Sequence, residues 1–78
     1  MNAEIYTQYG CPHCVIAKRI LTDRNIDYKE FTVGMGGITK ATIEEKIGVG
    51  AKITTVPQIF LDGKYIGGCD DLKRHFSL

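Results

Sequence analysis

The sequence predicts a single α/β domain, residues 1–78, in which a strand-helix-strand unit is followed by a second helix, a β-hairpin and a short last helix. Three observations carry this prediction. Apolar residues alternate in two early stretches that flank a segment with helical period. An Asp-Gly dipeptide, which suits a type I′ turn, separates two apolar runs. A Cys-x-x-Cys motif lies where the first strand should pass into the first helix.

The first strand is expected over residues 3–9, with Ile5 and Thr7 on one face and Tyr6 on the other. A helix is expected over residues 11–24, because apolar residues recur there at the three-and-four spacing of one helical stripe. This stripe, which should pack on the sheet, consists of Ile16, Ala17, Ile20 and Leu21.

Residues 28–33 alternate as a second strand, with Phe31 and Val33 on one face. A strand, a helix and a strand in this order imply a parallel pair joined by a right-handed crossover.

The second helix follows a glycine-rich break at residues 34–37. The segment that opens at Thr42 fits the capping-box pattern, although the helix could begin as early as Thr39. Gly48 is placed to end the helix in the left-handed conformation, and residues 49–53 then form a loop.

The Asp-Gly dipeptide separates residues 58–61 from residues 64–66 and predicts an antiparallel hairpin. A short helix should follow, with Asp70 and Asp71 in its first turn, where the helix dipole favours carboxylates.

Composition narrows the classes of partner. Ten Lys and Arg oppose nine Asp and Glu, a net charge of +1, and the basic residues are scattered, so nucleic acid is not an expected partner. No apolar run is long enough to span a membrane, and the first residues do not resemble a secretory signal. One close cysteine pair plus one single cysteine suits a reducing compartment, which points to the cytoplasm and to a cycling disulfide. We also expect the protein to be a monomer.

The motif Cys11-Pro12-His13-Cys14 is the first candidate site. A sulfur at a helix N-terminus faces free N–H groups and a partial positive charge, so Cys11 should be the thiolate nucleophile. Pro12 suits the first helical turn, and Cys14 lies one turn on, close enough to attack a mixed disulfide on Cys11. The alternative is a zinc site with ligands from Cys11, His13, Cys14 and Cys69.

Two further stretches are candidates for binding. A cis Val56-Pro57 bond would leave the backbone of Thr55 and Val56 free to pair with an extended substrate, whereas a trans proline would simply begin a strand. The glycine-rich residues 67–71 lead into a helix and could hold an anion, or they could be only a tight strand-to-helix turn.

Together these residues resemble the glutaredoxin family over nearly the whole chain. The resemblance implies a thioredoxin-like fold with a four-stranded mixed sheet and three helices, and a cis Val56-Pro57 bond. It also implies a thiol-disulfide oxidoreductase that uses glutathione and needs no metal. The blocks that carry the resemblance are Cys11-Pro12-His13-Cys14, Ala17-Lys18, Thr55-Val56-Pro57-Gln58-Ile59-Phe60 and Gly67-Gly68-Cys69-Asp70-Asp71-Leu72.

The resemblance further assigns the binding residues. Glutathione would lie across the motif, the Thr55-Val56-Pro57 segment and the glycine-rich turn. The backbone of Val56 would pair with its cysteinyl part. The turn at Cys69 and Asp70 would hold its γ-glutamyl carboxylate, and Asp71 would face its amino group.

Three departures from the family pattern leave alternatives open. Many glutaredoxins carry Lys or Arg shortly before the first cysteine, whereas residues 8–10 are Gln, Tyr and Gly, so a glutaredoxin-like protein reduced by thioredoxin reductase is one alternative. His13 replaces the usual Tyr. The loop over residues 48–54 is longer than in common bacterial members. This loop and the ending over residues 68–76 resemble phage-type glutaredoxins, which supply electrons to ribonucleotide reductase. A metal-binding module is the alternative from a different class. It would be either the zinc site described above or a dimer that bridges an iron-sulfur cluster.

Overall fold

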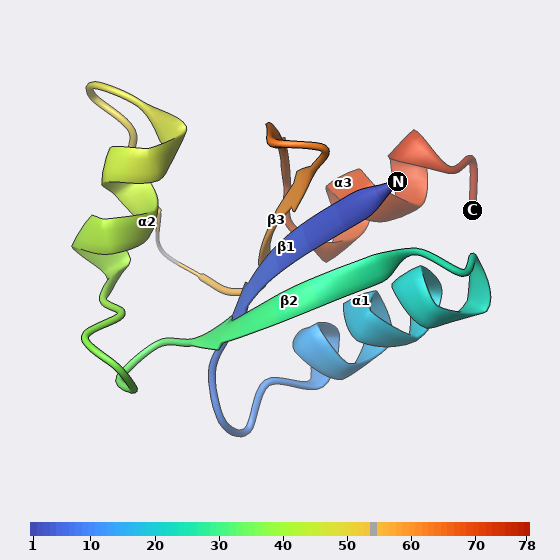
Figure 1. The fold of residues 1–78 in the computed structure, drawn as a ribbon, viewed down its shortest axis with the longest axis horizontal. Helices are drawn as coiled ribbons and strands as arrows, with labels where there is room; N and C mark the ends of the chain where they lie inside the picture. Colours follow the sequence, from blue (N-terminus) through green and yellow to red (C-terminus); the bar gives the residue numbers. More distant parts are fainter. Residues whose placement is uncertain (54) are drawn as a thin grey trace.

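A computed structural model of the chain describes residues 1–53 and 55–78. Within these residues it contains a four-stranded sheet and three helices (Figure 1). The elements are β1 (Asn2–Thr7), α1 (Pro12–Asp23), β2 (Asp27–Thr32), α2 (Lys40–Ile47), β3 (Gln58–Leu61), β4 (Lys64–Gly67) and α3 (Cys69–His75).

The strands are ordered β2-β1-β3-β4. Strands β1 and β2 are parallel, while β3 is antiparallel to both β1 and β4, so the sheet is mixed. The predicted strand-helix-strand unit followed by a hairpin, and with it the thioredoxin-like fold class, is therefore confirmed.

The sheet separates two apolar cores, and neighbouring residues of β1 point to opposite faces, as predicted. Ile5 belongs to the core under α1 and α3, and Tyr6, the next residue, belongs to the core under α2. The first core contains Ala3, Ile5, Ala17, Leu21, Ile26, Ile59, Leu61, Cys69 and Leu72. The second contains Tyr6, Ile43, Ile53 and Phe60. Helices α1 and α3 thus cover one face of the sheet and α2 the other (Figure 1).

The buried stripe of α1 is rotated from the predicted one. Cys14, Ala17 and Leu21 are buried, whereas Ile16 is 39% exposed, so the prediction for Ile16 was wrong. Successive helical residues lie about 100° apart, and a stripe centred on residues 14, 17 and 21 turns position 16 toward solvent.

Strand β1 ends at Thr7, two residues earlier than predicted. Gly10, with φ of +73°, completes a turn that brings the chain round to Cys11. The turn therefore sets where α1 begins relative to the sheet.

Helix α2 takes the earlier of the two possible starts. The Thr39 hydroxyl accepts from the Thr42 N–H at 3.2 Å, and the Thr42 hydroxyl accepts from the Thr39 N–H at 3.1 Å. Thr42 is thus the third residue of the helix and not its cap, so the capping box predicted at Thr42 was wrong. Gly48 does end the helix, but its φ of +144° lies outside the predicted left-handed helical region.

The β3–β4 hairpin has the predicted turn, with φ of +49° at Asp62 and +80° at Gly63. An irregularity in the ladder pairs Ile59 with Gly67. The beginning of β3 therefore lies beside the end of β4, which brings the segment before β3 next to the turn before α3.

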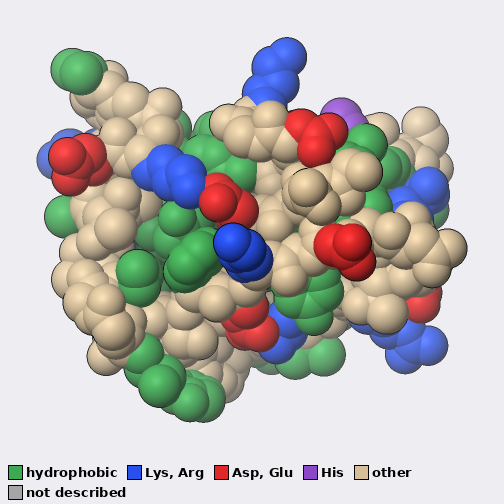
Figure 2. Space-filling model, in the orientation of Figure 1, with side chains coloured by type: hydrophobic (Ala, Val, Ile, Leu, Met, Phe, Trp, Pro, Cys, Tyr) green, Lys and Arg blue, Asp and Glu red, His purple; other side chains and the backbone are tan. Residues whose placement is uncertain are grey.

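Across the described residues, no helix is both long enough and apolar enough to cross a membrane. On the face shown in Figure 2, Lys and Arg side chains are interspersed with Asp and Glu side chains, and no basic stripe forms there.

Candidate active site

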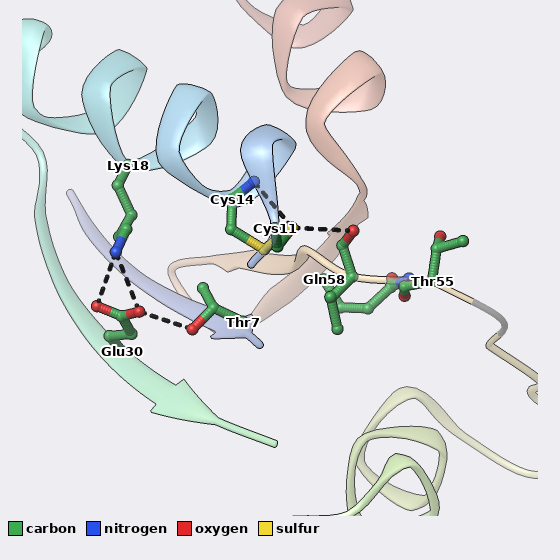
Figure 3. The surroundings of a disulfide bond; sticks show 8 residues. Thr7, Cys11, Cys14, Lys18, Glu30, Thr55 and Gln58 are labelled. Atoms are coloured by element: carbon green, nitrogen blue, oxygen red, sulfur yellow. Dashed lines mark hydrogen bonds and ion pairs between the residues drawn. A yellow bond between two sulfur atoms is a disulfide. The ribbon is translucent and has the colours of Figure 1, made fainter. Parts of the chain in front are cut away.

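Cys11 and Cys14 form a disulfide at the start of α1 (Figure 3), with their Cα atoms 5.3 Å apart. Cys11 is the N-cap residue and Pro12 is the first residue of the helix. The Cys14 N–H donates to the Cys11 Sγ at 3.1 Å, so the sulfur accepts the free N–H that a Ser or Asp side chain satisfies at other helix starts. After reduction the same N–H would favour a thiolate at Cys11.

The two sulfurs differ in access. Cys14 is only 2% exposed, whereas Cys11 is half-buried. A substrate sulfur can therefore approach Cys11 more easily than Cys14.

The segment before β3 lies beside the disulfide. The Val56-Pro57 bond is cis, as the resemblance implies. The Cys11 Sγ lies 3.6 Å from the Val56 carbonyl oxygen (Figure 3). The backbone at Val56 is thus in direct contact with the sulfur that sequence reasoning selected as the nucleophile.

A groove of about 370 Å³ runs from the motif to α3. It brings together seven of the residues selected from sequence with Gly68 of the predicted glycine-rich turn, and it adds Gln58 and Tyr65, which sequence reasoning did not select as site residues. Its lining residues are His13, Thr55, Val56, Pro57, Gln58, Tyr65, Gly68, Cys69, Asp70 and Asp71. A larger hollow of about 720 Å³ around the first residues of β1 and β2 contains none of the candidates.

Asp71 is held by the turn before its own helix. Its Oδ2 accepts from the Gly68 N–H at 2.9 Å, and its Oδ1 accepts from Arg74 at 2.5 Å. The hydrogen bond from Gly68, followed by that from Arg74, lowers the pKa of Asp71, which is therefore ionised at neutral pH. Gly67 makes this geometry possible, because a Cβ at that position would overlap the Asp71 side chain.

Cys69 is 5% exposed and packs in the core under α1 and α3. Burial raises the pKa of its thiol, so Cys69 stays protonated and poorly nucleophilic. Among the residues that the structure describes, no three His, Cys, Asp or Glu side chains are placed to share a metal ion. The zinc ligand set considered from sequence is therefore not assembled there.

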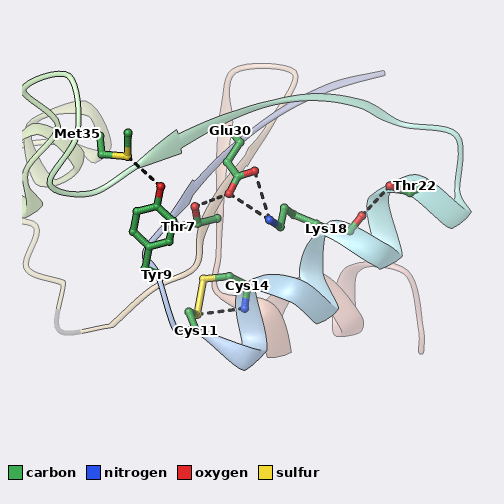
Figure 4. Close-up of polar contacts among 8 residues, drawn as sticks. All are labelled: Thr7, Tyr9, Cys11, Cys14, Lys18, Thr22, Glu30 and Met35. Carbon is green, nitrogen blue, oxygen red and sulfur yellow. Dashed lines mark hydrogen bonds and ion pairs between the residues drawn. A yellow bond between two sulfur atoms is a disulfide. The ribbon is translucent and has the colours of Figure 1, made fainter.

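A second, smaller groove of about 200 Å³ opens on the other side of the disulfide. Both cysteines line it, together with Thr7, Lys18 and Glu30. Glu30 accepts a hydrogen bond from Thr7 at 2.6 Å and pairs with Lys18 at 3.2 Å (Figure 4). The Thr7 hydrogen bond, and after it Lys18, lowers the pKa of Glu30.

Sequence reasoning noted Lys18 and missed both Thr7 and Glu30 as neighbours of the disulfide. The parallel register of β1 and β2, which the sequence alone does not specify, places them together. Glu30 pairs with Ile5, and Thr7 lies two residues beyond Ile5, so both side chains share the face that α1 covers.

The fold and the site define a class of protein. A cysteine pair cycling between dithiol and disulfide at a helix N-terminus, beside a cis-proline segment on a thioredoxin-like sheet, is the working part of a thiol-disulfide oxidoreductase. The family model described as "Glutaredoxin" matches residues 3–66. The chain belongs to the glutaredoxin family.

Curated relatives agree. Glutaredoxin 3 of Escherichia coli is 45% identical over 71 residues, which cover 91% of this chain and 81% of that protein. Hybrid peroxiredoxin hyPrx5 of Haemophilus influenzae is 42% identical over 76 residues, which cover 97% of this chain and 30% of the hybrid protein.

Solved structures share the fold. Glutaredoxin 1 of Francisella tularensis, complexed with cacodylate, has a TM-score of 0.78 and 34% identity, covering 97% of this chain and 92% of that one. Oxidised Escherichia coli glutaredoxin has a TM-score of 0.78 and 34% identity, covering 99% of this chain and 94% of that one.

Proposed function

We propose that this protein is a glutathione-dependent thiol-disulfide oxidoreductase. The Cys11 thiolate attacks one sulfur of a substrate disulfide, and the other substrate sulfur leaves as a thiolate that takes up a proton. Cys14 then loses its proton and attacks the Cys11 sulfur, which releases the second substrate thiol and forms the Cys11–Cys14 disulfide. Two molecules of glutathione reduce this disulfide in the same two steps and leave as glutathione disulfide.

The observation that carries the proposal is the surroundings of the Cys11 sulfur. It accepts the Cys14 N–H at 3.1 Å and lies 3.6 Å from the Val56 carbonyl oxygen. A thiolate at this position has a hydrogen-bond donor behind it and peptide backbone beside it, which suits a substrate that is itself a cysteinyl peptide.

The groove beside Cys11 supports glutathione as that peptide. The ionised Asp71 carboxylate complements an ammonium group, and the backbone at Cys69 and Asp70 can receive a carboxylate. Thr55, Val56 and Pro57 would lie along the cysteinyl part, with Pro12 and His13 as modulating residues of the motif. No metal takes part in this cycle.

Disulfide-containing proteins are the proposed second substrates, and the resemblance to phage-type members makes ribonucleotide reductase one candidate. One observation favours a different reductant. The residues before Cys11 are Gln8, Tyr9 and Gly10, so a basic residue that would meet the glycine carboxylate of glutathione is missing there. Thioredoxin reductase is therefore the second candidate.

A coupled assay decides between the two reductants. NADPH consumption with a small disulfide is followed once with glutathione plus glutathione reductase and once with thioredoxin reductase alone. The proposal expects turnover only in the first mixture. Turnover confined to the second would contradict it, and an absorption spectrum with a metal assay of anaerobically purified protein tests the zinc and iron-sulfur alternatives.

A further inference from the structure

Gln58 is a polar residue in an otherwise apolar strand, and it is 7% exposed. Its amide nitrogen donates to the Thr55 carbonyl at 2.9 Å (Figure 3). Its amide oxygen accepts from the Tyr65 hydroxyl at 2.5 Å. Because a carbonyl can only accept, the Gln58 nitrogen must face Thr55, and the oxygen is then left for Tyr65. The three residues therefore form one directed hydrogen-bond chain.

All three residues of this chain line the groove that we propose holds glutathione. Thr55 belongs to the segment before β3, and Tyr65 belongs to β4, near Asp71 in the wall formed by α3. The Tyr65 ring also packs against Phe60, with the ring centres 5.3 Å apart. The Tyr65 hydroxyl is therefore held by the sheet, and the Gln58 amide links it to the Thr55 carbonyl in the segment before β3.

The Thr55 carbonyl belongs to the same planar peptide unit as the Val56 N–H. In a trans peptide these two groups point in opposite directions, so fixing one fixes the other. A hydrogen bond from Gln58 to the Thr55 oxygen therefore sets the direction of the Val56 N–H, next to the carbonyl that contacts Cys11.

We propose that Gln58 and Tyr65 are positioning residues, which hold the Thr55–Val56 peptide unit in the orientation that pairs with the backbone of glutathione. The proposal rests on the proposed function. Neither side chain takes part in the chemistry at sulfur. Both raise the affinity of the groove for a cysteinyl peptide, while a thiol without a peptide backbone gains nothing from them.

The test uses the Cys14→Ser protein, which stops at the mixed disulfide on Cys11. It is equilibrated with mixtures of glutathione and glutathione disulfide, and the glutathionylated fraction is measured by mass spectrometry. The same titration is run with 2-mercaptoethanol and its disulfide, which have the same reacting group and no peptide. Two variants are added to this background, Gln58→Leu and Tyr65→Phe, with Tyr28→Phe in β2 as the matched control.

Gln58→Leu should lower the equilibrium constant for glutathionylation about three- to tenfold, the effect of losing one hydrogen bond. Tyr65→Phe should lower it by a smaller factor, about two. The Gln58 amide can still donate to Thr55, but the Tyr65 hydroxyl no longer holds its orientation. Both variants should leave the 2-mercaptoethanol constant and the Cys11 thiol pKa unchanged, and Tyr28→Phe should change nothing.

Unchanged glutathionylation in both variants would overturn the proposal, and so would an equal loss for both thiols. Tyr65→Phe removes one oxygen atom, so it keeps the test open if Gln58→Leu does not fold. The proposed function has a separate readout in the Cys14→Ser protein itself. If its equilibrium constant for the mixed disulfide were no larger with glutathione than with 2-mercaptoethanol, the proposed function would fail, whatever the two variants showed.

Discussion

Lys18 and Glu30 form an ion pair beside the disulfide, with the Lys18 ammonium 3.2 and 3.3 Å from the two carboxylate oxygens (Figure 4). Lys18 lies one turn after Cys14 on α1, and Glu30 belongs to β2. The Thr7 hydroxyl donates to the same carboxylate from β1. Lys18, the lysine or arginine of α1 closest along the helix to the cysteines, is therefore neutralised by the Glu30 carboxylate.

Glu30→Gln should lower the pKa of the cysteine thiols in the reduced protein. The substitution removes the compensating charge and leaves the Lys18 ammonium at the edge of the groove that both cysteines line. A nearby positive charge favours thiolate, and a more stable reduced form makes the potential less negative.

Thiolate absorbance against pH and equilibration with a glutathione buffer measure both effects. Glu45→Gln on α2, where the side chain is exposed, is the matched control and should change neither. Thiol titrations in Glu30→Gln identical to those of the unsubstituted protein would mean that Lys18 has no influence on the sulfurs.

Thr7→Val should raise the pKa of Glu30, because the Thr7 hydrogen bond is the largest cause of its lowering. A carboxyl whose pKa is lower in the folded than in the unfolded protein stabilises the fold above the unfolded pKa. That contribution is lost as the pH falls through the folded pKa. In Thr7→Val the free energy of unfolding should therefore fall less steeply with decreasing pH, below about pH 4.5.

An NMR titration of the Glu30 carboxyl carbon checks the first expectation, and urea unfolding at a series of pH values checks the second. Thr22→Val on the exposed side of α1 is the control. If the pKa of Glu30 did not move, Lys18 and not Thr7 would be its main partner.

Elements governed by local rules were predictable from the sequence. Asp62 and Gly63 have the positive φ values that their turn type needs, and these values depend only on the two residues themselves. Neighbours in β1 face opposite cores because the strand period is two. The helix start was ambiguous, since Thr39 and Thr42 both suit a cap and only the observed hydrogen bonds distinguish them.

Other errors and omissions concern contacts between separate elements. The apolar Ile16 fits a helical stripe, yet the packing of α1 on the sheet turns it outward. Gln58 meets Tyr65 only because the hairpin register brings β3 and β4 together, and Glu30 meets Lys18 only through the crossover of α1. Such pairs depend on register and helix rotation, which one sequence does not specify.

Cys11→Ser and Cys14→Ser should have different effects, because Cys11 alone is accessible and capped by the Cys14 N–H. Cys11→Ser should abolish all activity. Cys14→Ser should retain turnover of glutathione mixed disulfides, which need one thiol, and lose the reduction of protein disulfides that need a resolving attack. Assays with the two substrate types measure this. Preferential alkylation of Cys14 in the reduced protein would reverse the two roles.

Asp71→Asn should raise the apparent KM for glutathione roughly three- to tenfold, because it removes the carboxylate that we propose complements the ammonium group of glutathione. The Asn oxygen can still accept the Gly68 N–H, so the turn before α3 is retained. Arg74→Ala distinguishes a binding role of Asp71 from a structural one, because it removes the Arg74 hydrogen bond to Asp71 and leaves the carboxylate in place. Steady-state kinetics should show an unchanged KM for Arg74→Ala, and an equal rise in both variants would indicate a purely structural effect.

His13→Tyr should raise the pKa of the Cys11 thiol and make the redox potential more negative. His13 lies in the first turn of α1 and lines the groove beside Cys11. A neutral imidazole can donate an N–H toward the sulfur, and its protonated form adds a positive charge, so both forms favour thiolate. A change of about 0.7 to 2 kcal/mol corresponds to roughly 15 to 45 mV. Because His13 is exposed, solvent screening places the shift toward the lower value.

The matched control for this last substitution is His75→Tyr, which changes the other histidine of the chain at the last residue of α3. Thiolate absorbance against pH and equilibration with a glutathione buffer are measured for both variants and for the unsubstituted protein. The Cys11 sulfur already accepts the Cys14 N–H, so the imidazole adds to an existing donor and a partial shift is expected. Identical titrations and potentials in all three proteins would leave His13 without an electrostatic role, and the helix N-terminus alone would then account for the thiolate.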